Sequence, residues 1–425
     1  MDENVDIGSV TSAARSASRV LAGASPARKN AALEAIASAL VERAGEILAG
    51  NASDMERGRA NGMVEGLLDR LELTSERLGA IAASVREVAA LPDPVGEVVR
   101  GTTNELGLRI TQVRVPMGVV GMIYEARPNV TVDAAVLALK AGSAVVLRGG
   151  SAAEASNAAL VGAMRGALES VGLPADLVQT VDPWGRAGAN AMMVARGGID
   201  VLIPRGGAGL INAVVSHSTV PVIETGTGNC HVYVDAGADE EAALRIVMNA
   251  KTQRVGVCNA AETLLVHRDA APTFLPAVLR ELTGAGVLVH GDPAVLECGA
   301  GAGVDPAMLR EATEEDWATE YLAMELAVRV VDSIEEAIDH IRAYSSGHTE
   351  AICTPSLASA NAFRAGVDSA AIAVNASTRF TDGGQLGLGA EMGISTQKLH
   401  ARGPMGLAEL TTTKWIIEGD GTIRP

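Results

Sequence analysis

The chain has 425 residues, a formal net charge of -17 and a hydrophobic share of 48%. At roughly 150 residues per domain, this length predicts two or three domains. The negative charge argues against nucleic acid as a partner, because the phosphate backbone would be repelled. No apolar run approaches the ~20 residues that a membrane span needs, so no membrane partner is expected.

Four cysteines, Cys230, Cys258, Cys298 and Cys353, lie far apart and form no CxxC pair. This spacing predicts reduced thiols. The acidic start, MDENVDIGSV, lacks the basic and apolar regions of a signal peptide. We therefore expect a cytoplasmic protein. The seven histidines show no metal-ligand spacing, so no metal site is expected.

Residues 8–90 have the pattern of consecutive helices. An Ala-rich segment at 28–48 and a run from Leu78 to Val88, behind the helix start at Thr74, keep helical spacing. Alternating residues at 95–116 then predict a two-stranded ribbon. Such a ribbon is poorly explained as core and could reach a neighbouring subunit. The tail sequence TTTKWII predicts another short strand that could extend it.

The next segment, up to about residue 228, repeats one unit. Apolar runs (VVGMIY, AVVLRGG, LVQTV, DVLIPRGG) alternate with helical segments at 130–141, 153–171, 186–196 and 208–216. Strands that are apolar throughout, with helices between them, predict a parallel sheet covered on both faces. Glycine pairs after two strands, at 149–150 and 206–207, lie where such sheets bind phosphates. The chain has no G-x-G-x-x-G after its first parallel strand, so spacing alone favours ordinary turns.

The alternation restarts after residue 230. Strands HVYVD, TLLVHR, VLVH, LAVRVVD, EAICT and AAIAVN alternate with helices at 238–253, 272–283, 333–344 and 356–365. This pattern predicts a second α/β domain. The Gly-rich stretch 299–305 has the composition of a flexible loop.

Cys258 follows a helix and a short glycine-containing turn, ahead of what looks like a helix start. Unpaired backbone N–H groups and a nearby cation such as Arg254 would stabilise its thiolate there. The alternative is a buried small hydrophobe, the usual role of a lone cysteine. Cys298 and Cys353 lack this setting and are expected to be structural. Cys230 is also expected to be structural, although it could approach the site.

Glu224 falls at a strand end, where a carboxylate could act as a general base near a thiol. In an acidic protein, an exposed acidic residue is the slightly better interpretation. Glu224 is therefore not assigned a catalytic role.

Longer motifs agree in order and spacing from about residue 10 to the C-terminus. They are IYEARPNVTVD at 123–133, AVVLRGG at 144–150, DVLIPRGGAGL at 200–210, KTQR at 251–254, CNAAETLLV at 258–266, VNASTRFTDGGQLGLGAE at 374–391, STQKLHARGPMGL at 395–407 and TTTKWI at 411–416. In these motifs the chain resembles the glutamate-5-semialdehyde dehydrogenase family of the aldehyde dehydrogenase superfamily.

The resemblance implies two doubly wound α/β domains plus a β-ribbon for oligomerisation. It also implies that NADPH reduces an acyl phosphate, L-glutamyl 5-phosphate, to L-glutamate 5-semialdehyde in proline biosynthesis. The implied parts are a cofactor-binding domain at 1–94 and 117–228, a catalytic domain at 229–376, and an oligomerisation ribbon at 95–116 with 405–425.

For catalysis, the resemblance places Cys258 at the position of the family's nucleophile. Its thiolate would attack the acyl phosphate and form a thioacyl enzyme. The oxyanion that develops needs fixed donors. The candidates are the backbone N–H of Cys258 and the side chain of Asn259 or Asn129, and the choice between them stays open.

Substrate and cofactor residues follow from the same motifs. The expected substrate-binding residues are Glu125, Arg127, Asn375, Ser377, Thr378 and Arg379. The expected cofactor-binding residues are Arg148, Gly149, Gly150, Arg205, Gly206 and Gly207. A structural ion pair is the alternative role for either Arg127 or Arg379, but inside these motifs binding is the better interpretation.

The chain departs from the family at two positions. Many members have Lys after LRGG, a partner for the adenosine 2'-phosphate, and this chain has Ser151. The preference for NADPH over NADH therefore stays open. Many members have Pro after KTQR, and this chain has Val255, which affects loop stiffness only.

Two rival functions remain at this point. A hydrolytic aldehyde dehydrogenase would share fold and thiol but would need no phosphate. A non-catalytic protein that kept the fold is less consistent with Cys258, Arg379 and the glycine turns. The expected partners are further copies of this chain, as a dimer or tetramer, and a transient contact with glutamate 5-kinase.

Overall fold

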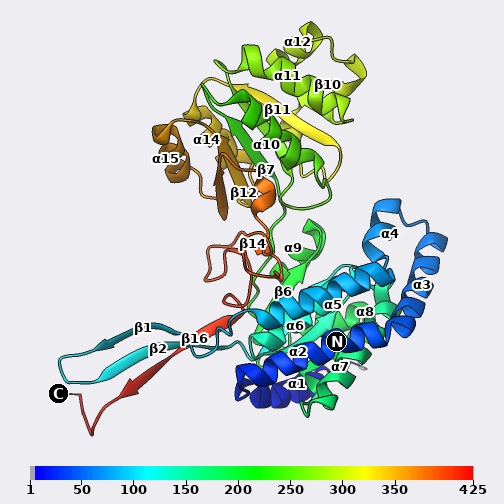
Figure 1. The fold of residues 1–425 in the computed structure, drawn as a ribbon, viewed down its shortest axis with the longest axis vertical. Helices are drawn as coiled ribbons and strands as arrows, with labels where there is room; N and C mark the ends of the chain where they lie inside the picture. The colour runs from blue at the N-terminus through cyan, green and yellow to red at the C-terminus, as the bar shows by residue number, and fades with distance from the viewer. Residues whose placement is uncertain (1–4, 425) are drawn as a thin grey trace. The chain divides into compact units, whose positions relative to one another are not determined.

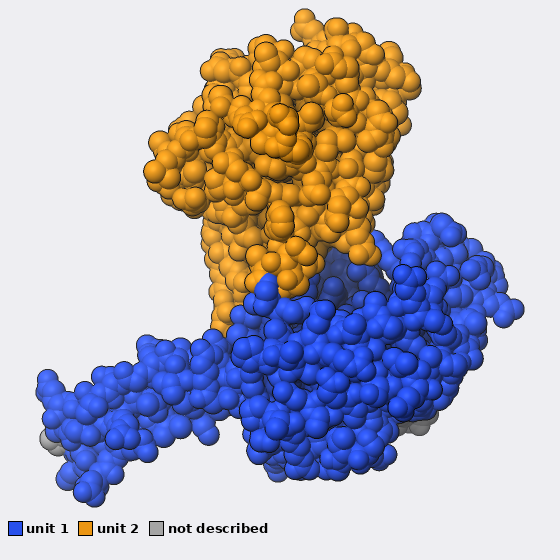
Figure 2. Space-filling model, viewed as in Figure 1, with its two compact units in different colours: residues 1–225, 387–393, 405–425 blue, residues 226–386, 394–404 orange. Residues whose placement is uncertain are grey.

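The computed structural model describes residues 5–424, and the chain divides into two compact units (Figure 2). Unit 1 comprises Met1–Thr225, Gly387–Gly393 and Met405–Pro425, and unit 2 comprises Gly226–Leu386 and Ile394–Pro404. The chain therefore passes between the units four times.

The N-terminal part of unit 1 is helical, as predicted. The helices are α1 (Ile7–Ala22), α2 (Pro26–Glu42), α3 (Ala44–Ala60), α4 (Glu65–Leu71) and α5 (Ser75–Ala90). Side-chain caps define three of the starts: Asp6, Ser25 and Thr74 accept hydrogen bonds from the backbone N–H groups of Ser9, Arg28 and Arg77. The predicted helix start at Thr74 is thus confirmed.

Unit 1 continues with a four-stranded parallel sheet in the order β5-β4-β3-β6. Its strands are β3 (Val119–Tyr124), β4 (Ala144–Arg148), β5 (Val178–Thr180) and β6 (Val201–Arg205). The helices between and after them are α6 (Pro128–Lys140), η1 (Ser151–Ala153), α7 (Glu154–Ser170), η2 (Ala175–Leu177), η3 (Asp182–Trp184), α8 (Gly185–Met193) and α9 (Ala208–His217). Because β4 and β6 flank β3, the strand order reverses there, and ligands bind at the carboxyl ends of such strands.

An antiparallel ribbon completes unit 1 (Figure 1). It consists of β1 (Val98–Thr103), β2 (Arg109–Pro116) and β16 (Thr411–Glu418). The C-terminal strand pairs with β2 from Thr411 opposite Pro116 to Glu418 opposite Arg109, so the tail extends the ribbon as expected.

Unit 2 is built on a seven-stranded sheet in the order β10-β9-β11-β8-β7-β12-β13, whose recorded pairings are all parallel. Its strands are β7 (Cys230–Val234), β8 (Ala261–His267), β9 (Leu288–Gly291), β10 (Leu309–Glu311), β11 (Glu325–Val331), β12 (Thr349–Cys353) and β13 (Ala371–Val374). Its helices are α10 (Glu240–Thr252), α11 (Ala271–Gly284), α12 (Pro293–Gly301), η4 (Pro306–Met308), α13 (Glu314–Trp317), α14 (Ile334–Tyr344), α15 (Leu357–Gly366) and η5 (Thr378–Phe380). A short pair, β14 (Ile394–Ser395) with β15 (Gly403–Pro404), lies apart from this sheet. The two parallel sheets confirm the predicted α/β class.

One expectation about unit 2 is wrong in part. The stretch 299–305 was expected to be a loop, but α12 extends to Gly301, and only residues 302–305 lie outside a helix. Asp292 caps the start of this helix by accepting a hydrogen bond from the Val295 N–H at 2.9 Å. A Cβ at Gly299 would lie 2.7 Å from a methyl carbon of Leu309. This glycine therefore serves close packing between α12 and β10.

Candidate active site

Cys258 lies half-buried in the turn that links α10 to β8. The Ala260 N–H donates to the Val257 carbonyl at 3.1 Å and closes the turn. No helix follows, so the expected helix start is wrong. The residues from Ala261 onward form a buried strand because they pair with β7 on one side and β11 on the other.

The backbone of Cys258 is held from the side of β7. A Cβ on Gly228 would overlap the carbonyl group of Cys258, so only glycine fits there. The Gly228 N–H donates to a carboxylate oxygen of Glu320 at 2.7 Å. The Cys230 thiol donates to the Cys258 carbonyl oxygen at 3.2 Å. Cys230 therefore does approach the turn, as the sequence suggested, but burial raises its pKa well above the ordinary thiol value.

Segment η5 contacts the other side of this turn. The Thr378 hydroxyl donates to the Asn259 carbonyl oxygen at 2.6 Å, and the Asn259 amide donates to the Thr381 carbonyl oxygen at 2.9 Å. Ser377 caps η5 by accepting from the Arg379 N–H at 3.3 Å. Ser377, Thr378 and Arg379, predicted from one motif, thus lie in the segment that contacts Asn259, predicted from a distant one.

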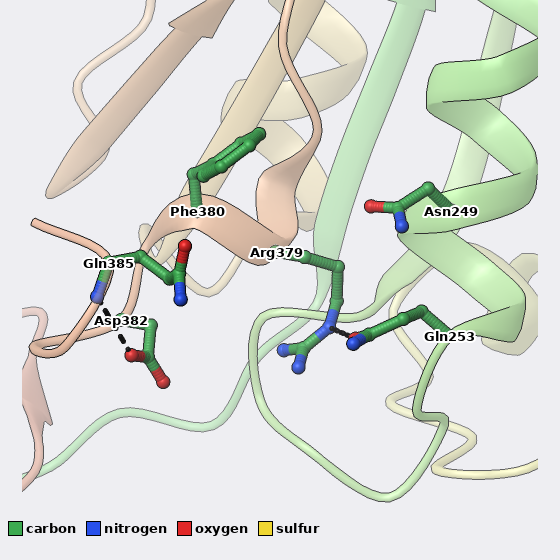
Figure 3. A pocket seen from close by; sticks show the side chains of 6 residues that line it. All are labelled: Asn249, Gln253, Arg379, Phe380, Asp382 and Gln385. Atoms are coloured by element: carbon green, nitrogen blue, oxygen red, sulfur yellow. Dashed lines mark hydrogen bonds between the residues drawn. The ribbon is translucent and has the colours of Figure 1, made fainter.

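A pocket of about 230 Å³ opens beside η5 (Figure 3). Its lining residues are Asn249, Gln253, Arg379, Phe380, Asp382 and Gln385. Burial lowers the pKa of Arg379, and the nearby Asp382 carboxylate opposes this shift. Arg379 still keeps its charge, because a guanidinium does not lose its proton in proteins.

Arg379 is fixed in this pocket by one neutral contact. Its Nε–H donates to the side-chain oxygen of Gln253 at 2.8 Å. No ion pair within 4 Å engages the guanidinium in the part of the chain that the structure describes. The alternative of a structural ion pair is therefore absent for Arg379, and its outer N–H groups lie in a pocket that suits a small anion.

The sequence did not single out five of the six pocket residues. Gln253 lies in the KTQR motif, and Phe380, Asp382 and Gln385 lie in the motif around Arg379. Because these motifs carry the family resemblance, the four residues could have been chosen as candidates from the sequence. Asn249 gave no signal, because a polar residue on α10 has the same pattern as a solvent-facing position.

Asn375 has a different environment from the rest of its motif. It adopts a left-handed backbone conformation with φ of 53°. Its side chain accepts from the Thr354 N–H at 2.8 Å and donates to the Thr354 carbonyl at 2.8 Å. These bonds join the ends of β12 and β13, and a role in substrate binding stays a prediction.

The IYEARPN motif lies in unit 1, at the end of β3. Glu125 accepts a hydrogen bond from the Gly207 N–H at 2.7 Å, so its carboxylate lies at a glycine turn predicted for the cofactor. The Arg127 N–H donates to the Glu125 carbonyl at 2.8 Å. The Asn129 amide donates to Asp133 at 3.3 Å, and burial raises the pKa of Asp133 to about 6. The substrate and oxyanion roles of these residues stay predictions.

The first turn of α9 has the form of an anion site. Gly207 occupies the N-cap position, no side chain caps the helix, and residues 207–209 are exposed. N–H groups at a helix start attract phosphate, and glycine lets it approach the backbone. The Gly207 N–H already donates to the Glu125 carboxylate, however, so the role of Gly206 and Gly207 in cofactor binding stays a prediction.

The second glycine pair, at 149–150, is explained in part by packing. The Gly149 N–H donates to Asp182 at 2.7 Å, and a Cβ on Gly150 would lie 2.6 Å from the Ala126 nitrogen. Arg148 donates to the Gly185 carbonyl at 3.1 Å and so stays at the carboxyl end of β4. The turn is rigid, with a basic side chain beside it.

Arg205 has a structural contact as well. Its guanidinium donates to the Met392 carbonyl at 3.2 Å and fixes the segment 387–393 on unit 1. Its role in cofactor binding stays a prediction.

Comparison with known proteins assigns the chain to a family. The profile of the aldehyde dehydrogenase family matches residues 2–284. Gamma-glutamyl phosphate reductase of Kineococcus radiotolerans is 61% identical over 411 residues, which cover 97% of this chain and 94% of that protein. The enzyme of the same name from Thermobifida fusca is 59% identical over 419 residues, which cover 99% of each chain.

Solved structures agree with this assignment. The crystal structure of gamma-glutamyl phosphate reductase from Thermotoga maritima covers 99% of this chain and 100% of its own, with a TM-score of 0.95 at 46% identity. An acetylating aldehyde dehydrogenase from Geobacillus thermoglucosidasius, at 19% identity and a TM-score of 0.69 over 99% of this chain and 98% of its own, shares the fold. The chain therefore belongs to the aldehyde dehydrogenase family and, within it, to the gamma-glutamyl phosphate reductases.

Proposed function

We propose that this chain reduces L-glutamyl 5-phosphate to L-glutamate 5-semialdehyde and releases phosphate, the second step of proline biosynthesis from glutamate. The observation that carries this proposal is the 61% identity over 97% of the chain to a gamma-glutamyl phosphate reductase. The turn around Cys258, held on both sides and next to the Arg379 pocket, supports it.

The first chemical step falls to Cys258. Its thiolate attacks the acyl carbon, a C–S bond forms, and the C–O bond to phosphate breaks, which leaves a thioacyl enzyme. The Cys258 N–H and an amide of Asn259 or Asn129 are the proposed donors to the oxyanion. Phosphate leaves with both electrons of the broken bond.

The second step is a reduction. Members of the aldehyde dehydrogenase family use nicotinamide cofactors, and the cofactor we propose, NADPH, supplies a hydride to the thioacyl carbon when bound. The chain's own part is to hold the dinucleotide, and residues 205–209 and 148–150 are proposed for this. Release of the aldehyde returns the Cys258 thiolate.

Substrate recognition is proposed for the two charged motifs. Arg379 would bind a carboxylate or phosphate by two parallel hydrogen bonds, with Ser377 and Thr378 beside it. Glu125, Arg127 and Asn375 are the further candidates.

The cellular setting is also a proposal. We place the protein in the cytoplasm, as a homodimer or homotetramer that forms through the ribbon. No helix within residues 5–424 is long and apolar enough to cross a membrane. A transient contact with glutamate 5-kinase is proposed because the acyl phosphate cyclises readily.

The reverse reaction tests the function. Purified protein is supplied with semialdehyde and NADP, and NADPH formation is followed by absorbance with and without phosphate. We expect turnover only with phosphate or arsenate, and a loss of at least about 10³-fold in Cys258→Ala, which removes the nucleophile. Cys298→Ala, on α12, is the control and should match the parent. NADPH formation that needs no phosphate would instead indicate a hydrolytic aldehyde dehydrogenase.

A further inference from the structure

The carboxyl end of β4 carries one guanidinium, Arg148, and the carboxylate of Asp182 interacts with it electrostatically. The strand ends at Arg148, and Gly-Gly-Ser-Ala-Ala follows before Glu154. Asp182 lies near the turn, but its two oxygens accept from the Gly149 N–H at 2.7 Å and from the Asn157 amide at 3.1 Å. In doubly wound sheets, an acidic residue about 20 residues beyond the first strand-to-helix turn binds the ribose 2'-hydroxyl of NAD, and an arginine nearby accommodates the 2'-phosphate of NADP.

A second arginine reaches this turn from a helix distant in the sequence. Arg57 on α3 donates to the carbonyl oxygens of Ser151 at 3.2 Å and Ala152 at 3.3 Å. Its side chain is 42% exposed, so part of the guanidinium faces solvent. Arg57 therefore adds a positive charge to a turn whose own residues 149–153 carry none.

Arg57 is held in this position by a buried carboxylate. It forms an ion pair with Asp54, whose side chain is fully buried. Asp54 also accepts from the Ser156 N–H at 2.8 Å, the Ser156 hydroxyl at 2.6 Å and the Ala155 N–H at 3.2 Å. The same carboxylate thus anchors the start of α7 and orients Arg57. A guanidinium fixed in advance loses little side-chain entropy when it binds phosphate.

We infer that Arg57, together with Arg148, binds the 2'-phosphate of NADPH and makes the chain selective for NADPH over NADH. The inference rests on the proposed function, because it takes a nicotinamide dinucleotide as the cofactor. Many family members have a lysine where this chain has Ser151, and Arg57 on α3 would supply the positive charge in its place. A guanidinium suits this role because its planar N–H groups match phosphate oxygens in pairs.

Binding of the cofactor without substrate tests the inference. NADPH and NADH are titrated into parent, Arg57→Ala and Arg59→Ala, and nicotinamide fluorescence gives each Kd. In Arg57→Ala we expect Kd for NADPH to rise about 10-fold to 100-fold, since charge-assisted hydrogen bonds are lost, while Kd for NADH stays within about twofold. Arg59 is the matched control, because it is exposed on the same helix and forms no ion pair within residues 5–424. Its variant should bind both cofactors as the parent does.

Two further variants at the exposed Ser151 test the same site, and the first keeps the ion pair between Arg57 and Asp54. Ser151→Glu should weaken NADPH about tenfold and leave NADH unchanged, because it places a negative charge beside the phosphate. Ser151→Lys in the Arg57→Ala background should restore NADPH affinity.

Circular dichroism and thermal melts confirm that each variant is folded. The inference is overturned if Arg57→Ala binds NADPH as the parent does. It is also overturned if folded Arg57→Ala loses affinity for both cofactors equally, or if Ser151→Glu leaves the NADPH affinity unchanged. The phosphate requirement of the parent enzyme tests the proposed function separately, because it does not depend on which dinucleotide binds more tightly.

Discussion

Asn259 follows the proposed nucleophile, and the two polar atoms of its side chain differ in their hydrogen bonding. Its amide nitrogen donates to the Thr381 carbonyl, whereas its buried oxygen has no hydrogen-bond partner among the described residues. The oxygen can only accept a hydrogen bond, so it cannot serve an oxyanion. The amide nitrogen has two N–H groups, and one of them donates to Thr381. The side chain therefore positions the turn, and its second N–H is the group that could donate to the oxyanion.

Substitution of Asn259 by Ala separates the two roles. If the amide donates to the oxyanion, kcat should fall about 10²-fold to 10³-fold with little change in KM, because the bond forms mainly in the transition state. If it only positions the turn, the melting temperature should fall and KM should rise. We expect the first result. Steady-state kinetics and a thermal melt on one preparation distinguish them, and Asn361→Ala on α15 is the control.

Some residue roles could be predicted from the sequence, and others could not. Cys258, Asn259, Thr378 and Arg379 were predicted because they lie in long motifs, and the structure brings them together. The need for glycine at Gly228 could not be predicted, since it depends on a carbonyl group 30 residues away that only the fold brings near.

At the scale of elements, two buried histidines give unit 2 an acid sensitivity. Burial lowers the pKa of His348, just before β12, to about 4, and burial followed by His231 and Arg329 lowers the pKa of His340, on α14, to about 3. The folded state therefore binds fewer protons than the unfolded state, in which histidine titrates near pH 6.5. The stability that this difference provides is fully present above about pH 6.5 and is lost as pH falls toward 4.

A substitution at His348 tests this linkage. In His348→Asn, the loss of stability between pH 7 and pH 5 should be smaller by about 2 kcal/mol, the free energy expected from the shift of one histidine to about 4. Urea unfolding at both pH values measures the difference. His217→Asn, at an exposed position on α9, should leave the pH dependence as it is in the parent. An unchanged slope in His348→Asn would contradict the assignment.

The elements themselves were predicted wherever the apolar pattern was long. Ten of the eleven strands of the two parallel sheets agree with expectation, because apolar runs bounded by turns specify buried parallel strands. The strand β10 and the helices α12 and α13 were not predicted. The glycines of α12 misled the prediction, since Gly299 packs against Leu309 and no local signal distinguishes a packing glycine from a flexible one.

At the scale of the whole molecule, the ribbon exposes apolar side chains. Trp415 is 52% exposed and Ile417 63% exposed on β16, and Val98 is 57% exposed on β1. A three-stranded ribbon with exposed apolar residues is a surface that a second copy would cover. This is the physical basis for the proposed oligomer.

The charged variant Ile417→Lys tests the oligomer. We expect a smaller species than the parent in size-exclusion chromatography with light scattering, because a buried ammonium without a partner weakens the interface. Ile423→Lys is the control, since Ile423 is 82% exposed and lies beyond the end of β16. An unchanged mass for Ile417→Lys would place the interface elsewhere.

The pairing of β16 with β2 also constrains how the protein can be made. The ribbon joins residues about 300 positions apart, because β16 pairs with β2 from Thr411 opposite Pro116 to Glu418 opposite Arg109. A chain is made from its N-terminus, so β1 and β2 leave the ribosome long before β16 is made. During synthesis, β2 is therefore an unpaired edge strand of the β1–β2 hairpin. Nascent chains on the same messenger RNA can pair with each other through this edge.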